Sequence, residues 1–166
     1  MAISASYPIP ENMRTTINAC TAGLGAAGVI GGLIGPGTDL VPIALTWVGM
    51  VVTLADQAGT GMDRQTAKKV CVATAMGVGT FALGTKLAST VGAWLLAPFT
   101  GGLSLAANVA ANVTLNAALT RYFGCAVARY FLQTEKIEDL DVMVKILIAL
   151  VGLDFGIASP IPDITA

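Results

Sequence analysis

The chain has 166 residues, of which 55% are hydrophobic and 11% are charged, and its formal net charge is -1. An ordinary soluble domain is about 25% charged, so this chain must bring apolar patches to the surface of a compact monomer. No basic stripe is present, and we expect no nucleic-acid partner. The absence of histidine excludes imidazole metal sites and Ser-His or Cys-His nucleophiles. We therefore predict a protein that is not an enzyme and has no catalytic residue, metal site or cofactor.

We predict one helical domain over residues 11–158, preceded by an extended segment (1–10) and followed by a tail (159–166). The N-terminus lacks the basic region of a secretion signal, so we do not expect a secreted protein. The three cysteines lie far apart in apolar runs, at Cys20, Cys71 and Cys125. We expect each to be a buried, reduced thiol.

The first predicted helix opens at Glu11 and continues without charge from Thr15 to Thr38. Its apolar part is rich in glycine, and each glycine costs about 1 kcal/mol relative to alanine in an exposed helix. Their G-x-x-x-G spacing allows two backbones to approach closely. We predict a helix-packing face made of Gly28, Gly31, Gly32 and Gly35. This face contacts a helix either of the same bundle or of another subunit.

Residues 35–39 (Gly-Pro-Gly-Thr-Asp) break the chain, and a second helix is predicted over residues 40–58. Asp63 is placed to cap a third helix, whose apolar run ends at Thr85. The basic residues in its first turns are Arg64, Lys68 and Lys69. They form either a solvated helix start or a contact with anionic lipid headgroups or an acidic partner.

No charged residue occurs between Lys86 and Arg121. Residues 97–102 contain one proline and two glycines and must break this run, so we predict a short helix over 87–97 and a long helix over 103–133. Trp94 lies near the break and is a candidate for contact with a membrane interface or a partner. An apolar hairpin with an uncharged tip is typical of a shallowly inserted membrane element, and equally of a hairpin buried in a large assembly.

A polar stripe follows the long helix at intervals of four residues: Ser104, Asn108, Asn112, Asn116 and Thr120. A stride of four follows the ridge along which helices cross, so we expect these side chains to bond to a neighbouring helix. The alternative is a polar lining for a water or ion path. Such a path normally carries an ionisable group, and the stripe contains none.

The sequence Arg-Tyr-Phe occurs twice near the end of this helix, at Arg121, Tyr122 and Phe123 and at Arg129, Tyr130 and Phe131. Basic and amphipathic aromatic residues favour a boundary between water and an apolar phase. The alternative is that one set packs in the core while the arginines pair with the acidic residues that follow, Glu135, Glu138 and Asp139. These acids precede the last predicted helix, over residues 142–157, and lack the spacing of a calcium loop.

The order of these features resembles the YcjF-like family, a hydrophobic GTPase-associated domain of unknown function. The resemblance covers residues 34–131: the turn at 35–39, the helix ending at Gly59, the basic pair Lys68 and Lys69, the apolar hairpin at 91–105 and the helix ending at 124–131. It implies membrane association and a relationship to a GTPase, and it supplies no catalytic residues. This sequence departs from the family in carrying no GTPase domain and in adding a Gly-rich first helix and a C-terminal helix.

We therefore predict an all-α bundle of five to seven helices with an apolar helical hairpin. The expected function is non-enzymatic: self-association into a homo-oligomer, association with a lipid bilayer, or both. This places the protein at a membrane or in a cytoplasmic assembly. The alternatives are a small channel or transporter lined by the polar stripe and a docking subunit for a separate GTPase.

Overall fold

Every regular element in the described part of the chain is an α-helix, which confirms the predicted fold class. The computed structural model describes residues 3–24, 40–135, 137 and 139–154, with the side chains of 40–42, 44, 79–92 and 94 left out. The described helices are α1 (Glu11–Gly23), α3 (Leu40–Gln57), α4 (Arg64–Thr100), α5 (Leu103–Gln133) and α6 (Leu140–Asp154).

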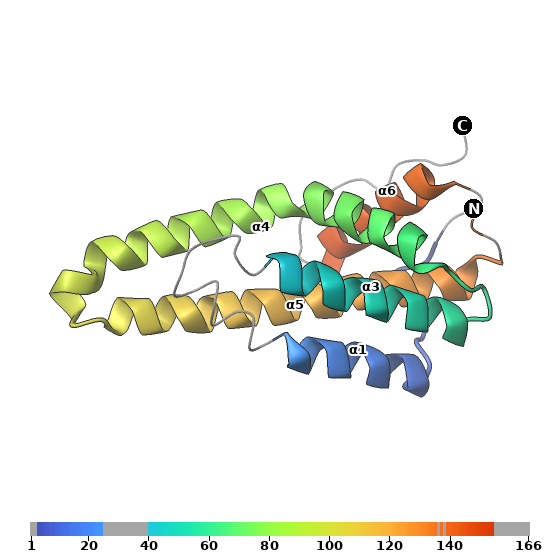
Figure 1. Cartoon of the computed structure of the whole chain (residues 1–166), viewed down its shortest axis with the longest axis horizontal. Coiled ribbons are helices and arrows are strands. Elements are labelled where there is room, and N and C mark those ends of the chain that lie inside the picture. The colour runs from blue at the N-terminus through green and yellow to red at the C-terminus, as the bar shows by residue number, and fades with distance from the viewer. Residues whose placement is uncertain (1–2, 25–39, 136, 138, 155–166) are drawn as a thin grey trace.

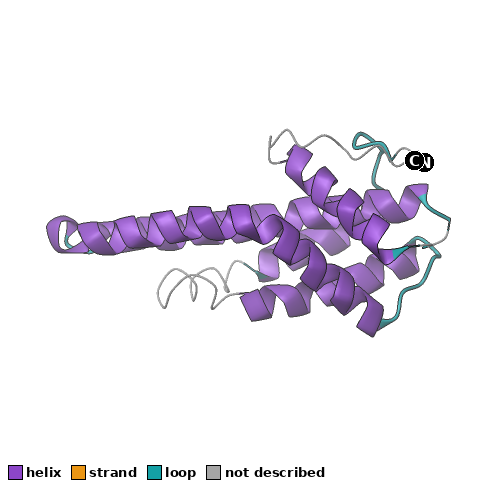
Figure 2. Ribbon diagram, turned by 90° about the horizontal axis from the view of Figure 1, so that it is seen from above, coloured by secondary structure: helices purple, strands orange, loops and turns teal. Residues whose placement is uncertain are grey.

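The helices α4 and α5 form an antiparallel hairpin that is much longer than the rest of the bundle (Figure 1). The other helices pack around one end of this hairpin, and its other end projects away from them (Figure 2). We call the uncharged stretch of the hairpin, residues 87–120, the arm, and the rest of the described bundle the head. The head therefore surrounds one end of two helices whose other end projects beyond the other described helices.

The core of the head contains buried residues from all five described helices, and α1, α3 and α5 meet in one part of it. Phe123 is fully buried there and stacks on Trp47, with ring centroids 4.2 Å apart. Gly124 follows it, and a Cβ at this glycine would lie 3.0 Å from Cγ1 of Ile17 and 3.0 Å from Sδ of Met50. A hydrogen in place of a side chain thus lets α1 and α3 approach α5 together.

Two local signals set the start of α4 and the turn between α4 and α5, as the sequence predicts. Asp63 caps α4, since its Oδ1 accepts hydrogen bonds from the backbone N–H groups of Gln65 (2.9 Å) and Thr66 (3.0 Å). At the tip, Gly101 and Gly102 have φ angles of +58° and +88°, a left-handed region that favours glycine. Both of their N–H groups donate to the carbonyl of Ala97, a pattern that terminates a helix in a tight turn.

Two predicted helix boundaries are wrong. The helices predicted to end at Thr85 and to begin at residue 87 are one continuous helix, α4. Lys86 and the nearby glycines do not break it, because they retain the backbone N–H that only proline lacks. The helix predicted to reach Thr38 ends at Gly23. The glycine face predicted for this stretch, Gly28, Gly31, Gly32 and Gly35, lies outside the described residues.

The start of the last helix is capped by an acidic residue. The Oδ1 of Asp139 accepts hydrogen bonds from the N–H groups of Asp141 (2.7 Å) and Val142 (3.4 Å), and α6 begins at Leu140. Carboxylates in this position also interact favourably with the helix dipole. The rest of the helix predicted to reach residue 157 and the predicted tail, 159–166, lie outside the described residues.

Candidate functional site

The exposed side chains that the structure describes on the arm are mainly apolar. At the tip, Phe99 is 86% exposed and Leu103 is 75% exposed, and Leu95 and Leu96 beside them are exposed as well. Along α5 the outward positions are occupied by small residues, Ala106, Ala107, Ala110, Ala111 and Thr114. The sequence signal for these positions is the uncharged run that contains them, and it does not show which of its residues face outward.

The buried face of α5 in the arm carries polar side chains. The amide residues of the predicted stripe, Asn108, Asn112 and Asn116, are buried, and so is Thr120. Asn112 Nδ2 donates to the backbone carbonyl of Asn108 at 2.9 Å, while its own Oδ1 is buried without a hydrogen-bond partner. The stripe therefore points into the molecule instead of toward solvent.

Members of this stripe connect neighbouring helices at both ends of the arm. Near the tip, Ser104 Oγ donates to the carbonyl of Ala93 at 2.8 Å, joining α5 to α4. At the base, Trp47 Nε1 donates to Thr120 Oγ1 at 3.0 Å, joining α3 to α5. Each of these bonds joins α5 to a neighbouring helix of the same chain.

Two threonine hydroxyls on the arm donate hydrogen bonds within their own helices. Thr114 Oγ1 donates to the carbonyl of Ala110 at 2.9 Å, and Thr100 Oγ1 donates to the carbonyl of Leu96 at 3.1 Å. Threonine in membrane helices uses the same bond to the carbonyl four residues earlier. Among the described residues, one helix, α5, is long and apolar enough to cross a membrane.

The predicted interface residues lie in different parts of the molecule. Arg121 is exposed at the base of the arm, and Tyr122 beside it is half-buried. The basic residues at the start of α4, Arg64, Lys68 and Lys69, are exposed at the end of the head that is farthest from the tip (Figure 1). Trp94 lies on α4 near the tip, and its side chain is outside the described part. The structure thus does not bring these residues into one site.

The second Arg-Tyr pair belongs to the head. Tyr130 is buried, with its ring edge-on to Phe131 at a centroid distance of 5.8 Å. Arg129 forms an ion pair with Asp154 on α6, with an N–O distance of 3.3 Å. The arginine partner is thus Asp154, which the sequence analysis did not propose because the pairing depends on how α6 folds back along α5.

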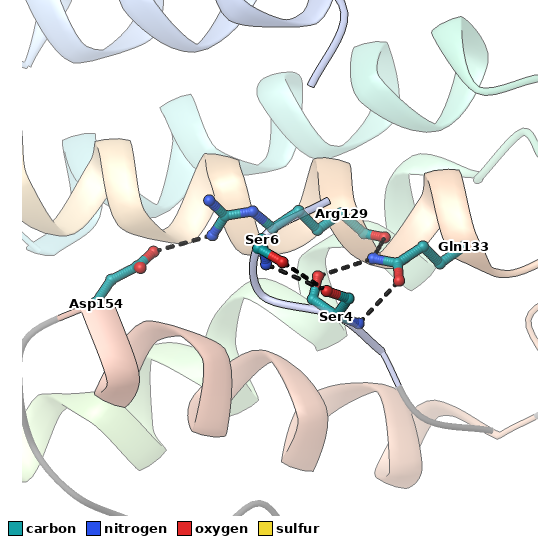
Figure 3. Close-up of polar contacts among 5 residues, drawn as sticks. All are labelled: Ser4, Ser6, Arg129, Gln133 and Asp154. Atoms are coloured by element: carbon teal, nitrogen blue, oxygen red, sulfur yellow. Dashed lines mark hydrogen bonds and ion pairs between the residues drawn. The ribbon is translucent and has the colours of Figure 1, made fainter. Parts of the chain in front are cut away.

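The N-terminal segment is attached beside this ion pair (Figure 3). Gln133 Oε1 accepts a hydrogen bond from the backbone N–H of Ser4 at 2.8 Å, and Gln133 Nε2 donates to the carbonyl of Ser4 at 3.1 Å. One side-chain amide therefore pairs with a backbone segment more than a hundred residues away in sequence. No local sequence signal marks Gln133 for this role.

The cysteines offer no reactive thiolate. Burial raises the pKa of Cys71 to about 12 and also raises the pKa of Cys20. The pKa of Cys125 is raised mainly by burial, with smaller opposing effects from nearby arginines. All three thiols are free, and a raised pKa makes a thiol slow to react at neutral pH. The described residues contain no group of His, Cys, Asp or Glu side chains placed to hold a metal ion.

Comparison with known proteins adds no relative on which a function could rest. The chain matches no family model, no curated protein and no solved structure.

Proposed function

We propose that this protein is a non-enzymatic membrane-associated module whose arm inserts into a bilayer as a helical hairpin, while the head stays outside. The supporting observation is the inverted polarity of the arm, with asparagines inside and Phe99 and Leu103 exposed. In water this arrangement is unfavourable, since exposed apolar surface costs about 25 cal/mol per Å². In lipid it is the expected one, because polar side chains then face a helix and apolar ones face the acyl chains.

The dimensions of the arm suit this insertion. From Leu103 to Arg121, α5 rises about 27 Å at 1.5 Å per residue, and the hydrocarbon core of a bilayer is about 30 Å thick. Both helices of the hairpin return to the head (Figure 1), so the arm enters and leaves on the same side. At the tip the N–H groups of Gly101 and Gly102 are already bonded to Ala97, which lowers the cost of placing the turn in lipid.

A homo-oligomer is the second candidate function. On the outer face of α5, the exposed residues Ala106, Ala110 and Thr114 recur every four positions. Small residues with this spacing let two helices pack closely. Arms from several copies could bury these faces against one another in place of lipid.

A vesicle-binding assay separates the two candidates. Phe99 and Met76 are both highly exposed apolar residues on α4, at 86% and 72%, but Met76 belongs to the head. We expect Phe99→Glu to lower binding to neutral phosphatidylcholine vesicles at least tenfold, because a charge in the hydrocarbon core costs about 3 kcal/mol. The matched variant Met76→Glu should bind like the unchanged protein. If the protein instead forms a soluble particle of many copies without detergent and does not bind vesicles, insertion is contradicted and self-assembly is supported.

Site-specific labelling locates the inserted part directly. An environment-sensitive dye on Phe99→Cys should shift to the blue and be quenched by lipid-borne quenchers. The same dye on Gln65→Cys, which is exposed at the far end of the same helix, should show neither effect. The native thiols interfere little, since their pKa values are raised. Equal signals at both positions contradict the proposal.

The transport and GTPase-docking hypotheses stay predictions from the sequence. A conduction path requires the asparagine stripe to line a space, and in the structure this stripe is buried against its own chain. Asn112→Leu in a liposome flux assay tests transport. Nucleotide-dependent co-purification of a GTPase tests docking.

A further inference from the structure

The described charges are unevenly distributed along the long axis of the molecule. The arm has none, and the two charges at its base are both basic: Lys86 on α4 and Arg121 on α5. Lys86 lies about 21 Å from the turn and Arg121 about 27 Å, at 1.5 Å per residue. They therefore stand within about one helical turn of the same level.

Carboxylates gather at the opposite end of the head, where α1, α4 and α6 begin and α3 and α5 end (Figure 1). The exposed acids there are Glu11, Asp56, Asp63, Glu135, Asp139 and Asp141. Within the described residues, the carboxylate that lies elsewhere, Asp154, is neutralised by Arg129. The exposed basic residues in the first turns of these helices number five, against six acids: Arg14, Arg64, Lys68, Lys69 and Lys145.

We propose that Lys86 and Arg121 bind the headgroups of anionic phospholipids and that this contact sets the orientation of the inserted protein. The inference rests on the proposed insertion of the arm, because insertion is what carries these two residues to the headgroup layer. Arg121 is exposed and has no ion pair with another described residue, so its guanidinium is available to phosphate oxygens. The end that carries the exposed carboxylates then lies farthest from the negative membrane surface.

The expected effect is a preference for anionic vesicles by a protein whose formal net charge is -1. Net charge alone predicts repulsion from such vesicles, whereas a basic pair at the membrane surface predicts attraction. Each basic residue near an anionic surface strengthens binding about fivefold. The distribution of charge and not its sum therefore decides the outcome.

The test compares binding of the full chain to phosphatidylcholine vesicles with and without about 30% phosphatidylserine. The unchanged protein should bind the anionic vesicles more tightly, and the double variant Lys86→Gln/Arg121→Gln should lose that gain while keeping its binding to neutral vesicles. The matched control Arg64→Gln/Lys68→Gln removes the same charge from the far end of α4 and should keep the gain. Circular dichroism and thermal melting verify that both variants fold.

Each of the other outcomes contradicts a different part of the proposal. If phosphatidylserine gives no gain, or if both double variants lose it equally, the lipid contact at the arm base is wrong while insertion stands. If the Arg64/Lys68 variant alone loses the gain, the far end faces the membrane and the proposed orientation is wrong. If the unchanged protein binds neither kind of vesicle, the insertion of the arm itself is wrong. Salt at about 0.5 M should remove the gain and spare binding to neutral vesicles.

Discussion

The head and the arm use the same two helices in opposite ways. In the head, α5 buries Phe123 and exposes Arg121, as a helix in water does. In the arm, the same helix buries Asn112 and exposes Leu103 and a row of alanines. One continuous helix therefore changes its polarity pattern along its length. This difference indicates that the two ends of the molecule are adapted to different surroundings.

The head and the arm also differ in how they use the few charged residues of the chain, which make up 11% of the sequence. In the described part, its charges lie in the head, where they cover a conventional apolar core. The arm keeps its few polar groups for internal hydrogen bonds, such as the bond from Ser104 to the carbonyl of Ala93. The longest stretch without charge is thus the part that we propose to lie in lipid.

The largest expected effect compares two phenylalanines. Phe123→Ala removes a fully buried ring that stacks on Trp47 and should lower the free energy of unfolding by about 3–5 kcal/mol. Phe99→Ala, at the exposed tip, should leave it nearly unchanged. Denaturant titration followed by circular dichroism measures both. An equal loss for Phe99→Ala would show that the tip is packed, and the contrast between head and arm would fail.

Two glycines test how closely the head is packed. Gly124→Leu places a side chain where a Cβ already meets Ile17 and Met50 at 3.0 Å, so overfilling should lower the free energy of unfolding by about 1–3 kcal/mol. Gly49→Leu is the matched change, because a Cβ at Gly49 meets nothing within 4 Å. The same titration should show no loss for it. A tolerated Gly124→Leu argues against the close approach of α1 and α3 to α5.

The inward orientation of the polar stripe can be tested at Thr120, where the arm joins the head. Thr120→Val keeps the shape of the side chain but leaves Nε1 of the buried Trp47 without its acceptor, which should cost about 1–2 kcal/mol. Thr114→Val, on the outer face, removes a hydroxyl bonded only within its helix and should change stability by less than about 0.5 kcal/mol. Thermal melting measures the loss of stability in both variants. A larger loss for Thr114→Val than for Thr120→Val would contradict the inward orientation of the stripe.

The smallest effect concerns the charged cap of the head. Hydrogen bonds from Thr66 lower the pKa of Asp63 below its ordinary value. This carboxylate therefore stabilises the fold above about pH 4, and its contribution is lost as the pH falls through the lowered pKa. Asp63→Asn keeps a capping oxygen and should show a slightly weaker acid dependence than the unchanged protein. Asp63→Ala should melt slightly earlier at neutral pH, and identical melting curves would contradict the cap.

Local signals predicted much of the fold. Long apolar runs, the cap at Asp63 and the glycines at the tip predicted the helical class and most helix ends, since each acts within a short stretch of sequence. The boundary predicted between Thr85 and residue 87 is wrong, since α4 continues through it. The hydrogen bonding of the backbone continues there without interruption.

The sequence by itself determined that the chain is helical, poor in charge and marked by an asparagine stripe beside an uncharged hairpin. It could not determine which way that stripe faces, because a spacing of four residues gives a common face and not its direction. Only the tertiary structure turned the asparagines inward, exposed Phe99 and Leu103, and paired Arg129 with Asp154. Those features depend on how distant helices cross, and helix crossing is decided by the packing of the whole bundle.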